Sequence, residues 1–304
     1  MNDKFKSGFV TILGEPNVGK STFLNAIIGE KIAITSKKPQ TTRKNMKGIY
    51  TDDDSQIIFV DTPGIHKSKN KLDEYMDLSI KKSLDDVDLI LYLVDIKNIE
   101  CDKILDDFKL IKKTKQYKLL IVNKIDLYED IDDVKSELFS KIDEADIKNI
   151  FNDTFYISSL KNKNITELIN KIKSFLPYGP IYYDVEQLTD EPIKNIIAEL
   201  IRQQCLYKLN KEIPHGIAVV VDKMIEKNKL TTIYATIICE RASHKGIIIG
   251  KSGSMLKNIG TASRIAIEKL LDTKVNLQLF VSVKENWRDE NTKLLNFGYD
   301  KKHL

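Results

Sequence analysis

Cysteine is scarce in this chain of 304 residues, which contains only three, at Cys101, Cys205 and Cys239. Their odd number and wide spacing exclude the disulfide framework of a small secreted protein, and no pair has the short spacing of metal ligands. We therefore expect reduced, mostly buried thiols in a cytoplasmic protein.

Long apolar runs are absent as well, since no stretch approaches the roughly 20 consecutive apolar residues that a membrane-spanning helix requires. The first residues, Met1 to Lys6, are polar and charged, so we expect no signal peptide. The composition, with 42% hydrophobic and 30% charged residues, is that of a globular protein. A chain of this length has room for about two domains, each with its own core.

The net charge is only +4, but it is unevenly distributed. Residues 1–180 hold 29 basic and 29 acidic residues, whereas residues 181–304 hold 19 and 15 and so carry the whole excess. Between Arg241 and Lys269, six basic residues accompany a single acidic one, Glu268. This positive field favours a nucleic-acid partner for the second half, although a charged run is more often a solvated face.

A phosphate-binding loop occupies residues 14–22, with the sequence Gly-Glu-Pro-Asn-Val-Gly-Lys-Ser-Thr. Its two glycines let backbone N–H groups surround a β-phosphate, while Lys20 would reach the β- and γ-phosphates and Ser21 would ligate magnesium. An apolar strand at 9–13 precedes the loop and an amphipathic helix beginning at Thr22 follows it; a chance glycine-rich turn would lack these flanks. The predicted nucleotide contacts here are Gly14, Asn17, Val18, Gly19, Lys20, Ser21 and Thr22.

A polar stretch at 36–47 contains Pro39-Gln40-Thr41-Thr42-Arg43. A threonine hydroxyl in such a loop can meet the metal only while the triphosphate is present, which is what a γ-phosphate sensor requires. We choose Thr42 for this role, with Thr41 as the alternative.

The next loop, Asp61-Thr62-Pro63-Gly64, follows an apolar strand at 56–60, where ligands bind in open α/β sheets. Asp61 would hold magnesium through water, and the Gly64 N–H would meet the γ-phosphate. Position 65 is Ile, which cannot orient an attacking water as a glutamine does, so we expect slow unaided hydrolysis. The predicted catalytic residues are Lys20, Thr42, Asp61 and Gly64, and the predicted magnesium ligands are Ser21, Thr42 and Asp61.

Base recognition is predicted at Asn123-Lys124-Ile125-Asp126, directly after an apolar strand at 119–122. This strand and a similar apolar run at 89–95 are expected to be covered on both faces of the sheet. A carboxylate at Asp126 can accept hydrogen bonds from both the N1–H and the exocyclic amine of guanine, a pattern that adenine does not offer. Asn123 and the Lys124 stem would hold the ring. The backbone amides of Ser158, Ser159 and Leu160 are predicted to approach the guanine O6.

Apolar strands alternate with amphipathic stretches such as 72–84 and 165–176, which predicts a three-layer α/β domain with a mostly parallel sheet. A Pro-Tyr-Gly-Pro sequence at 177–180 then interrupts the pattern. We therefore predict a nucleotide-binding domain at 1–177, a linker at 178–183 and a smaller α+β domain at 184–304.

In the second domain, a helix at 192–209, strands at 217–225 and 230–239, a helix at 254–271 and a strand at 275–283 are predicted. Gly250-Lys251-Ser252 is not a second phosphate loop, because Lys245 stands where its first glycine belongs. A Gly-x-x-Gly loop between two helices fits better, since it can approach the sugar-phosphate backbone of single-stranded RNA, with a plain helix-turn-helix as the alternative. The predicted RNA contacts are Lys245, Gly246, Ile249, Gly250, Lys251, Ser252, Gly253 and Lys257.

These motifs, taken in order, resemble those of the bacterial Era GTPases over nearly the whole chain. The resemblance implies a GTPase with a C-terminal type II KH domain that binds a single-stranded segment near the end of the small-subunit ribosomal RNA and assists ribosome assembly. It also implies that an apolar residue at Ile65 is normal, and that Asn17 occupies the position that helps bind a potassium ion in related GTPases. Ser252 departs from the family, which more often has glycine there.

Three functions remain open from the sequence. The main hypothesis is a GTP-hydrolysing switch, with GTP or GDP and Mg²⁺ as cofactors, coupled to RNA binding. The alternative is an RNA-binding module whose nucleotide domain rarely turns over. A GTPase at the inner face of the membrane is the third, although no lipidation signal or amphipathic anchor supports it. We expect a cytoplasmic monomer, with peripheral membrane association as a variant.

Overall fold

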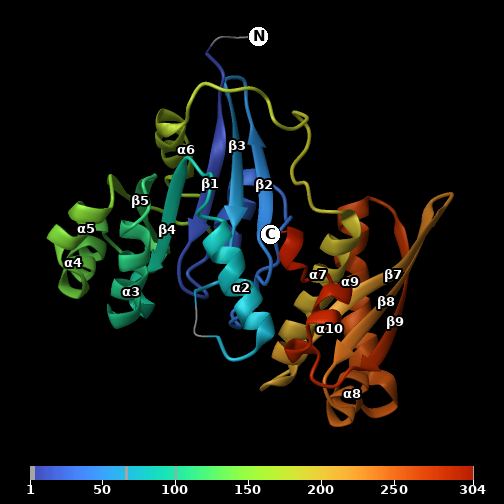
Figure 1. Ribbon diagram of the computed structural model, residues 1–304. Coiled ribbons are helices and arrows are strands. Elements are labelled where there is room, and N and C mark those ends of the chain that lie inside the picture. The colour runs from blue at the N-terminus through green and yellow to red at the C-terminus, as the bar shows by residue number, and fades with distance from the viewer. Residues whose placement is uncertain (1–3, 66–67, 100, 304) are drawn as a thin grey trace.

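The computed structural model describes residues 4–65, 68–99 and 101–303, apart from the side chains of residues 101, 102 and 303. Its first part is built around one large sheet, and its second part around a smaller one (Figure 1). No helix in the described part of the chain is long and apolar enough to cross a membrane. Cys205 and Cys239 are buried free thiols, while the side chain of Cys101 lies outside the described residues.

The first sheet has six strands in the order β2-β3-β1-β4-β5-β6. All neighbours pair in parallel except β2, which runs antiparallel to β3 at one edge. Its central strands are buried on both faces, which explains their continuous apolar sequences. The strands are β1 (Lys6–Leu13), β2 (Met46–Thr51), β3 (Ser55–Asp61), β4 (Leu89–Asp95), β5 (Tyr117–Asn123) and β6 (Asp153–Tyr156).

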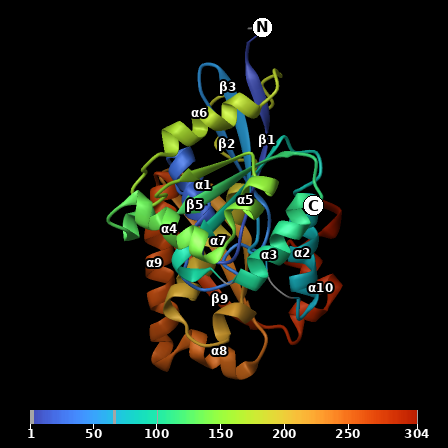
Figure 2. The ribbon, with the colours of Figure 1, turned by 90° about the vertical axis from the view of Figure 1, so that its left-hand side faces the viewer.

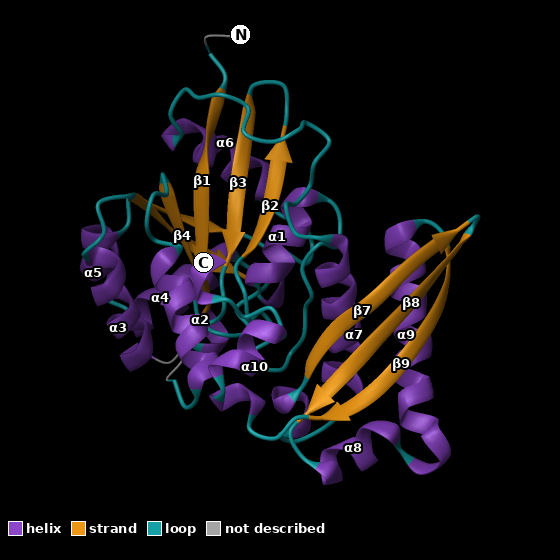
Figure 3. Ribbon diagram, turned by 45° about the vertical axis from the view of Figure 1, so that its right-hand side comes forward, coloured by secondary structure: helices purple, strands orange, loops and turns teal. Residues whose placement is uncertain are grey.

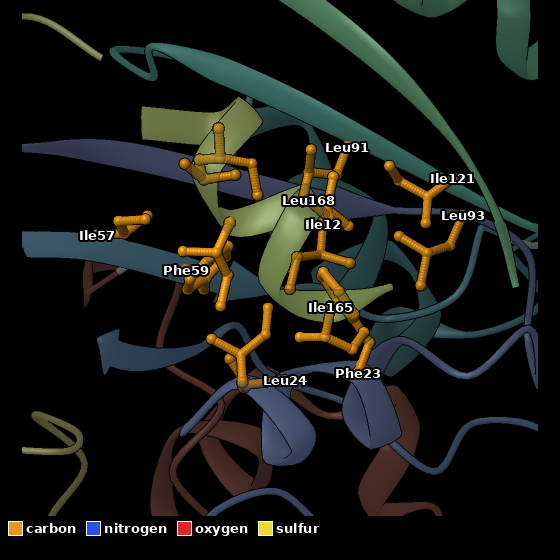
Figure 4. Close-up of a cluster of buried hydrophobic side chains, with 14 of the residues drawn as sticks. Ile12, Phe23, Leu24, Ile57, Phe59, Leu91, Leu93, Ile121, Ile165 and Leu168 are labelled. Atoms are coloured by element: carbon orange, nitrogen blue, oxygen red, sulfur yellow. The ribbon is translucent and has the colours of Figure 1, made fainter. Parts of the chain in front are cut away.

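Helices cover both faces of this sheet. On one face, α1 (Lys20–Ile28) and α6 (Ile165–Phe175) pack against alternate strand residues such as Ile12, Leu91 and Ile121 (Figure 4). The intervening residues pack on the other face against four helices. These are α2 (Lys71–Lys82), α3 (Cys101–Lys112), α4 (Ile131–Lys141) and α5 (Glu144–Ile150).

The second sheet has the order β7-β8-β9, with β7 antiparallel and β9 parallel to β8. The α7 and α9 helices pack against it and share one core with it (Figure 3). The elements follow the order helix, strand, strand, helix, helix, strand. They are α7 (Ile193–Lys208), β7 (Ala218–Lys227), β8 (Leu230–Cys239), α8 (Ala242–Ile249), α9 (Ser254–Leu271) and β9 (Lys274–Val283), followed by α10 (Asn291–Asn296).

The predicted fold class is confirmed, with differences in detail. The α1 helix begins at Lys20, two residues before the expected start at Thr22. Strand β2 was not predicted, and β7 extends to Lys227, which shortens the expected polar turn to two residues. The predicted linker lies within a segment, 176–192, that contains no helix or strand.

The segment after β9 packs between the two parts of the molecule. Trp287 is fully buried there, and its indole N–H donates a hydrogen bond to the carbonyl of Gly216 (3.0 Å). The rings of Tyr75 on α2 and Tyr299 meet edge to face at 5.6 Å. The sequence did not place this segment; the structure puts α10 beside α2, as Figures 1 and 2 both show.

Candidate functional site

Loops at the carboxyl ends of the parallel strands surround a cleft of about 790 Å³. This volume lies within the range of small-molecule and cofactor sites in general. The cleft is lined by residues from the phosphate-binding loop, the polar stretch and the predicted base-binding loops. Among them are Asn17, Gly19, Lys20, Ser21, Thr22, Thr42, Gly64, Asn123, Lys124, Asp126, Ser159 and Leu160.

The two glycines of the phosphate-binding loop adopt left-handed backbone conformations, with φ of +141° at Gly14 and +105° at Gly19. A Cβ at Gly14 would lie 2.3 Å from the carbonyl oxygen of Leu93, and one at Gly19 would lie 2.4 Å from Nδ2 of Asn123. We expected glycine here for the approach of phosphate. The structure adds two further reasons, which are backbone conformation and close neighbours.

Lys20, which lines the cleft, and Asp61, which contacts the cleft residue Ser21, are both buried. The Lys20 ammonium donates to the carbonyls of Gly14 (2.8 Å) and Glu15 (2.9 Å). Burial lowers the pKa of Lys20 to about 8, against the opposing attraction of Asp61. Burial likewise raises the pKa of Asp61 to about 6, opposed by Lys20 and by two hydroxyls. Phosphate beside Lys20 and a cation beside Asp61 would favour the charged form of each group.

The three predicted magnesium ligands converge. The Ser21 and Thr42 hydroxyls lie 2.9 Å apart, and Asp61 Oδ2 accepts hydrogen bonds from Ser21 (2.7 Å) and Thr42 (3.4 Å). The rival, Thr41, instead donates its hydroxyl proton to the carbonyl of Lys38 (2.7 Å). The structure therefore brings Thr42, and not Thr41, to this point.

This oxygen cluster fits magnesium. Asp61 Oδ1 is buried and has no hydrogen-bond partner among the described residues, so one carboxylate oxygen is available to a cation or its water. The described residues contain no group of three or more His, Cys, Asp or Glu that could hold a metal. Such a group is not needed, because Mg²⁺ commonly uses one or two protein oxygens together with waters and substrate phosphates.

Gly64 lies against the phosphate-binding loop, since a Cβ there would be 2.8 Å from the Pro16 ring. Ile65 is half-buried and packs against the core on the α2 side of the sheet. Its side chain therefore contributes to this core. The expectation that it orients no water stays a prediction.

The predicted base site is built by hydrogen bonds between its loops. Asn123 Nδ2 donates to the carbonyl of Val18 (2.9 Å), which fixes this loop against the phosphate-binding loop. Lys124 has a left-handed backbone (φ 66°) and its ammonium binds the carbonyl of Asn17 (2.7 Å) and the carboxylate of Asp95 (2.6 Å). Asp126 is exposed at the rim, as a group that reads a base must be.

Two of the three amides expected at guanine O6 are used elsewhere, which corrects that expectation. The Ser158 N–H donates to the carbonyl of Lys163 (3.2 Å), and the Ser159 N–H donates to Asn123 Oδ1 (3.0 Å). Both serines instead support the site, because the Ser158 hydroxyl donates to Asp126 (2.5 Å) and the Ser159 hydroxyl to Asn123 (2.9 Å). The Leu160 amide stays a prediction.

The Gly-x-x-Gly loop joins α8 and α9 as a tight turn. Three of its residues have positive φ: Gly250 (73°), Ser252 (51°) and Gly253 (78°). A Cβ at Gly250 would lie 2.7 Å from that of Met255, whereas one at Gly253 would meet nothing within 4 Å. Gly253 therefore faces open space, and Ser252 adopts a conformation that glycine adopts more easily.

The remaining predicted RNA contacts gather around this turn. Lys245, Gly246, Lys251 and Lys257 are exposed, and Ile249 is half-exposed. One of the six basic residues counted in this region, Arg264, is neutralised by an ion pair with Glu268 (2.8 Å). Of the other five, Lys245, Lys251 and Lys257 surround the turn with exposed positive charge.

Several residues of the site escaped sequence reasoning. Asp95 and Asn123 each end an apolar run in the sequence, which was the available signal that they lie at the same edge of the sheet; the register places them opposite each other, and Asp95 binds Lys124. Arg43 directly follows Thr42 and is only 2% exposed. Its guanidinium donates hydrogen bonds to two carbonyls of the second domain. No sequence pattern signals these hydrogen bonds, because the partners lie more than 170 positions away in the chain.

Comparison with known proteins decides the family. Residues 9–124 match the family model described as 50S ribosome-binding GTPase, and residues 212–288 match that of the KH domain. The chain is 50% identical over 303 residues to a GTPase Era of Clostridioides difficile, covering 98% of this chain and all of that protein. The chain belongs to the Era family of GTPases.

Era proteins from other organisms agree with this assignment. The GTPase Era of Lactobacillus helveticus is 46% identical to this chain over 303 residues. The match covers 99% of this chain and 98% of that protein. The crystal structure of a single-residue variant of Aquifex aeolicus Era bound to GDP.AlF4⁻ superposes with a TM-score of 0.89 at 34% identity, over 97% of this chain and 99% of that one. An Era structure in complex with MgGDPNP and nucleotides 1506-1542 of 16S ribosomal RNA matches equally well. As an Era GTPase, the protein hydrolyses GTP.

Proposed function

We propose that this GTPase is a molecular switch that binds single-stranded RNA near the end of the small-subunit ribosomal RNA and assists assembly of that subunit. The observation that carries the proposal is the placement of Thr42. Its hydroxyl lies beside Ser21 and Asp61, while its neighbour Arg43 is bound to the second domain. One short loop thus contacts both the nucleotide cleft and the domain with the Gly-x-x-Gly turn. The Era complex with 16S ribosomal RNA supports the choice of RNA.

The chain's own groups have distinct roles in this proposal. Lys20 neutralises β- and γ-phosphate oxygens, and the phosphate-binding loop supplies backbone N–H donors. Ser21, Thr42 and Asp61 hold magnesium, Asp61 through water. Gly64 donates its N–H to the γ-phosphate. Magnesium, when bound, neutralises charge that develops on the phosphate oxygens.

Guanine selection is assigned to Asp126, supported by Ser158, and to Asn123 and Lys124, with the Leu160 amide at O6. Asn17, whose carbonyl binds Lys124, is the residue that would help hold potassium. Lys245, Lys251 and Lys257 contact RNA phosphates, while Gly246, Gly250, Ser252 and Gly253 let its backbone approach and Ile249 contacts a base.

We further propose the division into a nucleotide-binding domain at 1–177, a linker at 178–183 and a KH domain at 184–304, in a cytoplasmic monomer. Peripheral membrane association is the weaker possibility, and sedimentation with anionic liposomes at two salt concentrations tests it. Binding that is lost at high salt, in protein free of RNA, would support a membrane role for the lysine surface.

The deciding experiment measures GTP hydrolysis in potassium and in sodium buffer, with and without a short single-stranded RNA from the end of 16S ribosomal RNA. We expect faster hydrolysis in potassium and further stimulation by RNA. Gly253→Asp should abolish the RNA effect, because the added carboxylate repels phosphate and a side chain strains the left-handed backbone of this turn (φ 78°). It should leave the basal rate unchanged.

Asp61→Ala serves as the inactive control, since it removes the carboxylate of the magnesium cluster while RNA binding persists. Tight RNA binding with no change in the hydrolysis rate would favour the alternative, an RNA-binding module with a slowly turning nucleotide domain. RNA stimulation that survives Gly253→Asp would remove the turn from the RNA site.

A further inference from the structure

The loop that carries Thr42 is fastened to the second domain by the residue that follows it. Arg43 is 2% exposed and lies between the domains. Its Nη1 donates to the carbonyl of Ile217 (2.6 Å), and its Nη2 donates to the carbonyl of His215 (2.8 Å). The guanidinium carbon lies 6.0 Å from the ring centroid of Trp287. Both acceptors and the ring belong to the second domain.

A second arginine holds the same loop on the other side of Thr42. Arg202 of α7 is 1% exposed and donates from Nη2 to the carbonyl of Thr41. It is itself fixed by an ion pair with Glu199, one helical turn earlier (2.5 Å). Thr42 therefore lies between two residues that are both bound to the second domain.

The attachment extends along the loop. The carbonyl of Thr35 accepts hydrogen bonds from Gln203 Nε2 (2.6 Å) and from the Tyr207 hydroxyl (2.7 Å), both on α7. The Lys38 ammonium donates to the carbonyl of Leu209, just after that helix. The second domain thus holds this loop at several points from Thr35 to Arg43, while the first domain contacts it through Gln40, which donates to Asp73 (2.9 Å), and through Thr42.

We propose that Arg43 is a positioning residue for GTP hydrolysis, through which the docked second domain holds the Thr42 hydroxyl at the magnesium cluster. The inference rests on the role proposed above for Thr42 and assigns the element that places it. A second domain that shifts on binding RNA would then change the metal site through this arginine.

The physical basis is the burial of a permanent charge. A guanidinium has fixed planar geometry, so its two hydrogen bonds to carbonyls of rigid backbone define the position of residue 43 closely. Displacing the loop while the domains stay docked would leave that charge buried without acceptors, which is strongly unfavourable. The docked domain therefore favours one loop position, the one that brings Thr42 to Ser21 and Asp61.

The test compares Arg43→Ala and Arg43→Lys with the wild-type protein. Lys47→Ala is the matched control, because Lys47 also joins the first domain to the segment before α7, through Asp190 (2.8 Å), but lies away from the magnesium cluster. Three quantities are measured: the single-turnover GTP hydrolysis rate, the affinity for GDP, and the affinity for the non-hydrolysable analogue GDPNP as a function of Mg²⁺ concentration.

For Arg43→Ala we expect hydrolysis to fall by about 10- to 100-fold, the scale of misplacing a reacting group by roughly an ångström. GDPNP should need about tenfold more Mg²⁺, because one hydroxyl ligand is lost. GDP affinity should stay within about twofold, since no γ-phosphate engages Thr42. Arg43→Lys should be intermediate, because an ammonium reaches only one of the two carbonyls. Lys47→Ala should resemble wild type in all three measurements.

A wild-type rate in Arg43→Ala would overturn the inference. So would equal losses of GDP and GDPNP affinity, which would indicate general damage to the domain. The GDPNP-to-GDP affinity ratio needs no turnover, so it still decides the role of Arg43 if the RNA-coupled switch proposed above fails. Conversely, RNA stimulation retained in Arg43→Ala at a reduced basal rate would leave the switch intact and remove Arg43 as the coupling residue.

Discussion

At the scale of single residues, the proposed guanine site depends on one exposed carboxylate. Asp126 stands at the rim of the cleft and is oriented by the Ser158 hydroxyl (2.5 Å). Asp126→Asn should weaken GTP binding by about 100-fold, because two charge-assisted hydrogen bonds to guanine are lost. The variant should bind xanthosine triphosphate more tightly than the wild type does, since the amide of Asn can donate to the xanthine carbonyl that replaces the guanine amine. Competition binding with the two nucleotides measures the shift.

The matched control for this change is Asp130→Asn. Asp130 caps α4 by accepting from the Asp132 N–H (3.1 Å), and asparagine caps a helix equally well. This variant should keep the preference for GTP. An unchanged base preference in Asp126→Asn would remove the guanine assignment.

The buried carboxylate of Asp107 lowers the free energy of unfolding at neutral pH. Asp107 is 8% exposed and accepts from the Tyr92 hydroxyl (2.6 Å), and burial raises its pKa from 3.8 to about 6. A raised folded-state pKa contributes stability that is complete below the unfolded value of 3.8 and lost as the pH rises through about 6. Between about pH 4 and pH 7, the ionisation of Asp107 therefore lowers the free energy of unfolding by on the order of 2 kcal/mol.

Asp107→Asn keeps an acceptor for Tyr92 and removes the titration. It should therefore be more stable than wild type at neutral pH, with the difference shrinking in acid. Urea unfolding, followed by circular dichroism at about pH 4 and about pH 7, measures the difference in free energy of unfolding between the variant and the wild type. Asp132→Asn is the control, since Asp132 forms an exposed ion pair with Lys135. A stability difference that does not vary with pH would contradict the argument.

At the scale of elements, the sequence predicted what periodicity and length determine. The buried strands β4 and β5 were found because both faces are covered and their residues are uniformly apolar. Strand β2 was missed because it is a short edge strand, half-buried, that contains a glycine and is paired on one side only by β3. Its other side meets the segment 176–192, which contains no helix or strand, where the Ile49 N–H donates to the carbonyl of Leu188 (2.9 Å).

The same contrast holds for the site. Its loops were predicted because glycine, lysine and carboxylate spacings are local and chemically constrained. The contacts of Arg43 and of Trp287 were not predicted from the sequence, because they join residues far apart in the chain and depend on how the two domains dock. The amides of Ser158 and Ser159 were misassigned for a related reason, since their partners follow from the loop conformation.

At the scale of the whole molecule, the contact between α2 and the C-terminal segment is the second link between the domains. The α2 helix follows the Asp-Thr-Pro-Gly loop, and its Leu72, Tyr75 and Met76 share an apolar cluster with Trp287 and Tyr299. The α2 helix therefore packs against the second domain, as the loop that carries Thr42 does. Both loops predicted to sense the γ-phosphate are thereby linked to the second domain.

Trp287 is the single tryptophan of the chain, so its fluorescence reports on this contact. Tyr75→Ala removes a ring that is 4% exposed and should weaken docking by on the order of 3 kcal/mol. Trp287 would then meet water, and its emission should move to longer wavelength. Glu74→Ala, on the exposed side of the same helix, should leave the spectrum unchanged. An unshifted spectrum in Tyr75→Ala would mean that Trp287 is buried by the second domain alone, which would leave the Arg43 loop as the principal link between nucleotide and RNA.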